Sequence, residues 1–122
     1  MLKSKIFCIF TFIIFYSCET KESERFKIMS YNVENLFDIE DDSLTNDNQF
    51  TPTGDYYWTY NKYKKKLADI AKVITAVGEW DAPALVGLCE IENSNVLFNL
   101  VKNSPLEVQN YSFVHKESPD DR

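Results

Sequence analysis

Two stretches of this sequence place amide and carboxylate side chains where an apolar segment ends. Asn32 and Glu34 close the alternating stretch that begins at Phe26, and Glu90 closes the nearly continuous apolar run of residues 84–91. Carboxylate oxygens suit a hard cation such as Mg²⁺, which keeps several waters and is completed by substrate phosphate. An amide is neutral, so Asn32 can donate to a phosphate oxygen or orient a ligand without repelling it. Two interpretations fit this pattern: a metal and phosphate site, or groups that only cap the helices that follow the strands.

The elements that must position these residues follow from the spacing of apolar side chains. Alternation with period two predicts strands, and apolar residues three and four apart predict helices. In chain order we expect a strand at 26–33, a helix at 60–77 ended by Gly78, a strand at 84–91, a helix at 94–103 capped by Ser94, and a strand at 110–116. The run at 84–91 is typical of a strand buried on both faces. Because α/β sheets bind ligands outside the carboxyl ends of their strands, this α/β order brings both polar stretches to one edge.

Other conspicuous residues receive structural interpretations. The lysines of the helix at 60–77 lie away from its apolar stripe, so we interpret them as a solvated face, although they could touch phosphates. Cys89 is interpreted as a small buried residue and not as a nucleophile. The acidic loop at 38–58 has Ser43 and Gln49 where an EF-hand needs Gly and Glu, which excludes that site. The formal net charge of −6 argues against a general polyanion binder, but a bound cation would supply positive charge.

The N-terminal residues form a separate unit. A positively charged start precedes an apolar run at 6–16, which is the layout of a secretory signal peptide and is too short to span a bilayer. The following Cys18 completes a sequence that resembles a bacterial lipobox. We therefore expect 1–17 to be a signal peptide, Cys18 to carry lipid and 18–25 to be a polar tether. The expected location is a membrane-anchored lipoprotein of the outer membrane, periplasm or cell surface, with an uncleaved anchor or ordinary secretion as alternatives.

Residues 26–38 (FKIMSYNVENLFD) and 82–93 (APALVGLCEIEN) resemble the opening motifs of the endonuclease/exonuclease/phosphatase superfamily. That family includes relatives of apurinic endonuclease and pancreatic-type deoxyribonuclease, and the segments at 62–74 and 117–122 resemble its bacterial branch. The resemblance implies a two-sheet β-sandwich flanked by helices, with four layers in the deoxyribonuclease-like arrangement. Residues 26–122 would be an incomplete N-terminal part of that α/β domain.

Carried onto this sequence, the resemblance implies roles for three residues. Glu90 would be the principal ligand of Mg²⁺ (or Mn²⁺), and Asn32 would sit beside the metal and the scissile phosphate. Glu34 falls where some relatives have an Asp that supports the metal, whereas Glu92 reads as a helix-start residue. The water-activating Asp–His pair of the family has no match here, because His115 comes too early in the chain.

The implied function is Mg²⁺-dependent phosphodiester hydrolysis of the endonuclease type, by an N-terminal fragment that is inactive and poorly stable alone. Two alternatives stay open. One is a phospholipid or inositol-phosphate phosphodiesterase of the same fold, and the other is a noncatalytic surface lipoprotein module. The expected partners are nucleic acid or another phosphodiester, and the membrane through Cys18; no protein partner is expected.

Overall fold

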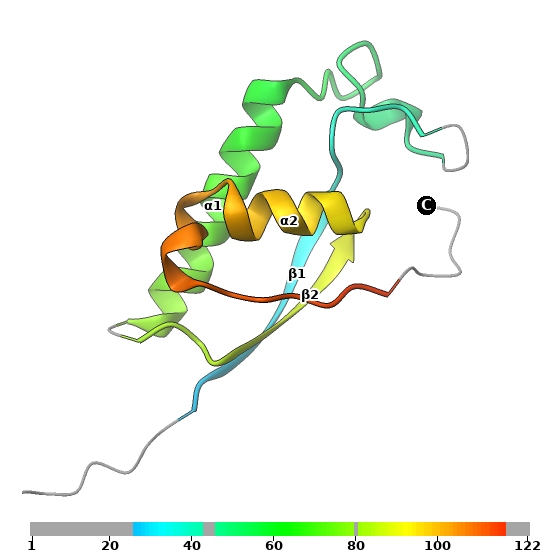
Figure 1. Cartoon of the computed structure of the whole chain (residues 1–122). Coiled ribbons are helices and arrows are strands. Elements are labelled where there is room, and N and C mark those ends of the chain that lie inside the picture. The colour runs from blue at the N-terminus through cyan, green and yellow to red at the C-terminus, as the bar shows by residue number, and fades with distance from the viewer. Residues whose placement is uncertain (1–25, 43–45, 80, 117–122) are drawn as a thin grey trace, which may run out of the picture.

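The computed structural model describes residues 26–42, 46–79 and 81–116, and it centres on two parallel strands connected through a helix (Figure 1). The elements are β1 (Ile28–Leu36), the 3-10 turn η1 (Asn48–Phe50), α1 (Tyr60–Gly78), β2 (Leu85–Ile91), α2 (Ser94–Lys102) and the 3-10 turn η2 (Pro105–Gln109). The mixed α/β organisation agrees with the prediction. The two-sheet sandwich does not appear among the described residues, where the strands form one two-stranded sheet.

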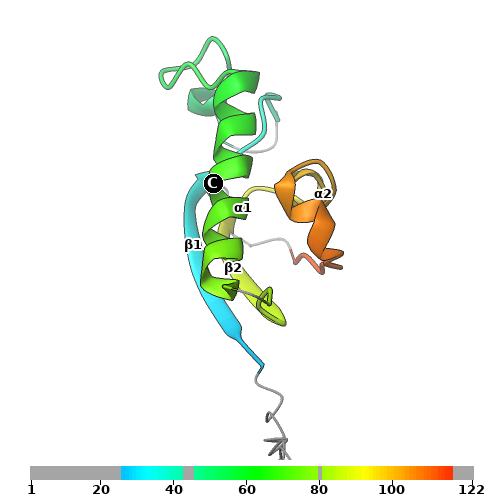
Figure 2. The ribbon, with the colours of Figure 1, turned by 90° about the vertical axis from the view of Figure 1, so that its left-hand side faces the viewer.

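One hydrophobic core joins the sheet to both helices. α1 buries the middle of the predicted apolar stripe, which is Tyr63, Leu67, Ile70 and Ile74. The predicted end residues of the stripe, Tyr60 and Val77, are exposed. α2 adds Val96 and Leu100, both 0% exposed, and β1 adds Met29 and Val33. Figure 2 shows β1 on the side of the molecule opposite to α2. Removal of these apolar side chains from water is the main force that holds the helices on the sheet.

Among the described residues, none of the helices covers the opposite face of the sheet, and the prediction that the second strand is buried on both faces is wrong. Ile28 of β1 is 73% exposed and Leu85 of β2 is 61% exposed. Cys89 is also exposed, so it is not the buried residue that the sequence suggested. The helices cover one face of the strands within the described residues, so alternate side chains of β2 point to solvent.

Local boundaries differ from the predictions in three places. β1 runs to Leu36 rather than ending at residue 33, because it continues through an irregularity described below. Asn93, not Ser94, caps α2, since its side chain accepts from Val96 N at 2.9 Å. Residues 110–116 form no strand. That segment is held by side-chain bonds instead, in which Tyr111 donates to the Pro83 carbonyl and accepts from Lys102 at 3.4 Å.

The second half of the long polar loop packs through its aromatic residues. The Phe37 and Phe50 rings stack with centroids 4.1 Å apart, and Trp58 meets Phe50 edge-on at 6.3 Å. Trp58 Nε1 also donates to the Phe37 carbonyl at 3.0 Å. Gly54 is required where the loop turns back, because a Cβ there would lie 2.1 Å from the Asn48 carbonyl oxygen. This cluster fixes the chain that leaves β1.

Candidate functional site

The two strands separate at their carboxyl ends through an irregularity in β1. Asn32 pairs with Cys89 and Leu36 pairs with Ile91, so β1 advances four residues while β2 advances two. The backbone at this point is left-handed in both strands, with φ of 56° at Glu34, 59° at Asn35 and 62° at Glu90. Such a φ is uncommon outside glycine and costs on the order of 1–3 kcal/mol per residue. Strain of this size concentrated at one strand edge suggests a functional constraint.

Glu90 is held at this edge by two hydrogen bonds from β1. Asn32 Nδ2 donates to Glu90 Oε1 at 2.7 Å, and the backbone N–H of Asn35 donates to Glu90 Oε2 at 3.0 Å. Hydrogen bonds to an ionised carboxylate are stronger than neutral ones, so the carboxylate is well oriented. Glu90 and both donors are exposed at the end of the sheet. The arrangement presents a fixed carboxylate to solvent and to any ligand that approaches this edge.

The Asn32 side chain uses both ends of its amide. Its Nδ2 binds Glu90, while its Oδ1 accepts from the backbone N–H of Glu34 at 2.8 Å. The oxygen is therefore engaged in shaping the turn of β1. In this geometry Asn32 orients the Glu90 carboxylate.

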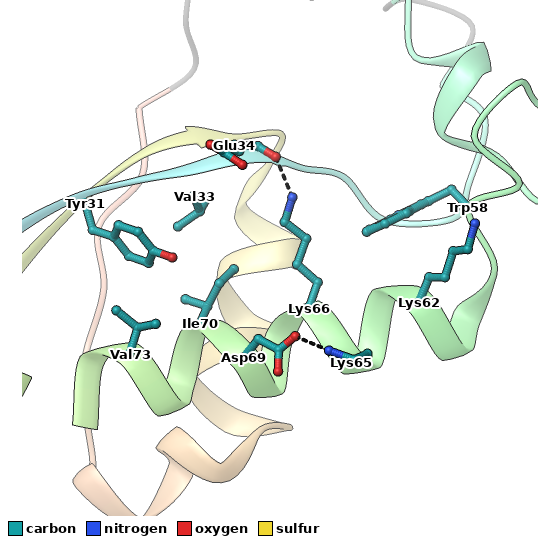
Figure 3. A pocket seen from close by; sticks show the side chains of 10 residues that line it. All are labelled: Tyr31, Val33, Glu34, Trp58, Lys62, Lys65, Lys66, Asp69, Ile70 and Val73. Atoms are coloured by element: carbon teal, nitrogen blue, oxygen red, sulfur yellow. Dashed lines mark hydrogen bonds and ion pairs between the residues drawn. The ribbon is translucent and has the colours of Figure 1, made fainter. Parts of the chain in front are cut away.

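Lys66 reaches this edge from α1. Its ammonium donates to the backbone carbonyls of Glu34 and Asn35, the latter at 3.1 Å, and lies 5.7 Å from the centre of the Trp58 ring. Burial lowers the pKa of Lys66, and the negative charges of Glu34 and Glu90 oppose that shift. Figure 3 shows Lys66 between β1 and α1. Lys66 lines an open hollow of about 400 Å³ together with Tyr31, Ile70 and other residues. One lysine of the helix thus belongs to the site rather than to a solvated face.

Glu92 links the two strand ends behind this site. Its backbone N–H donates to the Leu36 carbonyl at 3.2 Å, and its Oε2 accepts from the Asp38 N–H at 2.7 Å. The Asp38 carboxylate in turn accepts from Asn93 Nδ2 at 3.2 Å. The interpretation of Glu92 as a helix-start residue missed this cross-strand contact, which no local sequence pattern reveals.

The pKa of Glu92 reflects this partly buried, acidic surrounding. The pKa of Glu92 is raised from 4.5 to about 7, mainly because the carboxyl is partly buried and also because Asp38 and Asp47 are negatively charged, while the hydrogen bond from the Asp38 N–H acts in the lowering direction. Asp47 is itself 1% exposed, so it is a poorly solvated neighbour. A protonated Glu92 can donate to Asp47, whereas two carboxylates would repel each other.

We expect the folded chain to lose stability as the pH rises from about 4.5 through about 7, because the folded state binds the Glu92 proton more tightly than the unfolded state. Glu92→Gln keeps an acceptor for Asp38 and carries no charge. Its free energy of unfolding should exceed that of the native sequence by on the order of 2 kcal/mol at pH 8 and by nothing at pH 4.5. Urea unfolding in the presence of EDTA at both pH values measures this difference. An equal effect of the substitution at the two pH values would contradict it.

The residues at the strand ends fit a hard divalent cation. Within 26–42, 46–79 and 81–116, no group of three or more His, Cys, Asp or Glu side chains could hold a metal by itself. Mg²⁺ needs no such group, since one or two carboxylates with water and substrate oxygens complete its shell. Glu90 offers two oriented oxygens on an exposed residue. Glu34 is also exposed, and its backbone N–H is bonded to the Asn32 side chain at the same edge. The donor set is all oxygen, which suits Mg²⁺ or Mn²⁺.

The predicted site residues are thus gathered at one edge as far as the structure describes them. Asn32 and Glu90, 58 positions apart, are hydrogen-bonded, and Glu34 lies beside them. Cys18 and the segment at 117–122 lie outside the described residues. Asn35 and Lys66 were missed as site residues, since backbone contacts leave little trace in a sequence. In the described part of the chain, no helix has the length and apolar character needed to cross a membrane.

Comparison with known proteins identifies the family. Residues 27–122 match the model of the Endonuclease/Exonuclease/phosphatase family, so the match covers the whole described structure except Phe26. Neither a curated protein nor a solved structure gives a significant match. The family match confirms the resemblance found in the strand-end motifs. The chain belongs to the endonuclease/exonuclease/phosphatase family.

Proposed function

We propose that this chain carries the metal-binding part of a Mg²⁺-dependent phosphodiester hydrolase of the endonuclease type. Family membership indicates hydrolysis of phosphodiester or phosphate ester bonds. The observation that supports the metal dependence is the Glu90 carboxylate, fixed by Asn32 and the Asn35 N–H where two parallel strands end. Mn²⁺ is expected to substitute for Mg²⁺, because both prefer oxygen ligands.

The residues at the strand ends have different proposed roles in cation binding. Glu90 would hold the cation through its oxygens, and Glu34 would add a second carboxylate, directly or through water. Asn32 and the Asn35 N–H keep Glu90 oriented, so little ordering remains when the cation binds. When bound, the cation supplies charge neutralisation at the phosphate and a bound water of lowered pKa.

The proposal also includes the remainder of the site. By resemblance, a water-activating Asp–His pair and further strands of a two-sheet sandwich would come from sequence beyond residue 122. The chain would then be an N-terminal fragment that binds metal but does not turn over substrate. Cleavage of DNA by the purified chain would refute this part of the proposal while leaving the metal site intact.

Calorimetric titration with Mg²⁺ and Mn²⁺ tests the core of the proposal. We expect one site per chain for each ion. Glu34→Gln should weaken binding by about tenfold if the second carboxylate contributes, given that loss of a supporting group usually costs 10–100-fold. A chain that binds neither ion would contradict the proposal and favour a noncatalytic module whose acids only shape the strand ends.

The substrate is proposed to be a nucleic acid backbone, with a phospholipid or inositol phosphate as the competing phosphodiester. Export and anchorage through a lipidated Cys18 are also proposed, on the order of charged, apolar and cysteine residues in 1–18. An anchored enzyme would meet its substrate outside the cytoplasm. Activity of the protein that contains this chain towards DNA, RNA and lipid vesicles would separate these substrates.

A further inference from the structure

Lys66 differs from the other lysines of α1. Lys62, Lys64, Lys65 and Lys72 are exposed, whereas Lys66 is half-buried. Its ammonium donates to two consecutive backbone carbonyls, those of Glu34 and Asn35. These are the two left-handed residues of β1. α1 therefore places the Lys66 ammonium against the left-handed turn of β1.

Lys66 supplies donors where the register of the sheet is interrupted. Residues 34 and 35 lie within the irregularity of β1 and have no partner residue in the register of β2. An ammonium is a compact charge with three donors and can serve both carbonyls at once. The Trp58 ring, 5.7 Å away, restricts where that ammonium can go.

In the same turn, the Asn35 N–H donates a hydrogen bond to Glu90 Oε2 at 3.0 Å. The direction of that N–H depends on the left-handed backbone that Lys66 holds through the adjoining carbonyls. We propose that Lys66 is a positioning residue for the Glu90 carboxylate. It acts through the backbone of residues 34–35 and does not contact the cation. This inference rests on the proposed metal site at Glu90.

Electrostatic repulsion alone predicts the opposite change in Mn²⁺ affinity when Lys66 is replaced. Lys66 is attracted by both Glu34 and Glu90, so its charge lies close enough to repel a cation bound there. If Lys66 acted through charge alone, Lys66→Met would bind Mn²⁺ more tightly. If it positions Glu90, Lys66→Met binds Mn²⁺ more weakly in spite of the lost repulsion. The direction of the change therefore separates the two roles.

The test compares Lys66→Met with Lys66→Arg and with Lys65→Met in the full chain. Lys65→Met is the matched control, because Lys65 is on the same helix and its side chain is 76% exposed in a pair with Asp69. We expect Lys66→Met to weaken Mn²⁺ binding by about tenfold, Lys66→Arg to recover most of the loss, and Lys65→Met to change little. Tighter or unchanged binding in Lys66→Met, or an equal loss in Lys65→Met, would overturn the proposal.

A second readout needs no metal. The Asn35 amide proton resonance should move in Lys66→Met towards the position that it has in Glu90→Gln, where the acceptor is altered, while resonances of α2 stay in place. If the native chain binds no Mn²⁺, the proposed function fails and this resonance still decides the role of Lys66. An Asn35 resonance that Lys66→Met leaves unchanged would refute positioning, and shifts throughout the core would show a general structural role instead.

Discussion

Glu90→Gln is expected to abolish tight binding of Mg²⁺ and Mn²⁺, with a loss of affinity of about 100-fold or more. Loss of a supporting group usually costs 10–100-fold, and removal of the principal ligand should exceed that. The glutamine also places an NH₂ group where two donors, Asn32 Nδ2 and the Asn35 N–H, now meet two carboxylate oxygens. One of the two hydrogen bonds must therefore be lost, and the side chain turns away from its present orientation.

Glu107→Gln provides the matched control for this prediction. Glu107 lies in η2, is exposed, and its substitution removes the same charge from a chain with formal net charge −6. If cation binding reflected general negative charge, both variants would lose the same small amount of affinity. An affinity of Glu90→Gln that matches that of Glu107→Gln would remove Glu90 from the site.

Leu100→Ala is expected to have the largest effect on stability. The Leu100 side chain is 0% exposed and belongs to the core that joins α2 to α1 and the sheet. Truncation of a buried leucine costs about 2–5 kcal/mol, from lost burial and from the cavity that is left. Because a small domain has only about 5–15 kcal/mol of net stability, this variant should unfold at much lower urea concentration or be unfolded without urea.

Leu85→Ala makes the same chemical change at a residue of β2 that is 61% exposed. We expect a loss below about 1 kcal/mol there, since little apolar surface returns to water. Circular dichroism during urea titration of both variants measures the difference. Equal losses would mean that α2 does not form part of the core.

Local patterns were sufficient to predict the elements of this fold that bury apolar stripes. The helix at 60–77 was placed within one residue of α1, because Tyr63, Leu67, Ile70 and Ile74 repeat with helical spacing. The position of the second strand was predicted correctly, but the prediction that both of its faces are buried was wrong. A continuous apolar run describes a strand that two layers could cover, and in the described residues one layer covers it.

The site could be predicted in part, for a similar reason. The meeting of Asn32 and Glu90 could be predicted because each lies at the end of an apolar strand, and parallel strands bring such ends together; their roles at a metal site stay a prediction. The left-handed turn at Glu34 and Asn35 could not be predicted from the sequence, because neither residue is a glycine. The contacts of Lys66 and Glu92 depend on that turn and on backbone groups, so they follow from the three-dimensional path of β1 and not from residue types.

Site-specific broadening of amide resonances by Mn²⁺ tests the central claim most directly. With substoichiometric Mn²⁺ added to the ¹⁵N-labelled chain, the account predicts that the amides of Asn32, Glu34, Asn35 and Glu90 broaden first. The acidic residues Asp38, Asp41 and Asp42 provide an internal comparison, since they would attract cations without forming the proposed site. Broadening that centres on those residues, or that appears nowhere specific, would contradict a metal centre at the ends of β1 and β2.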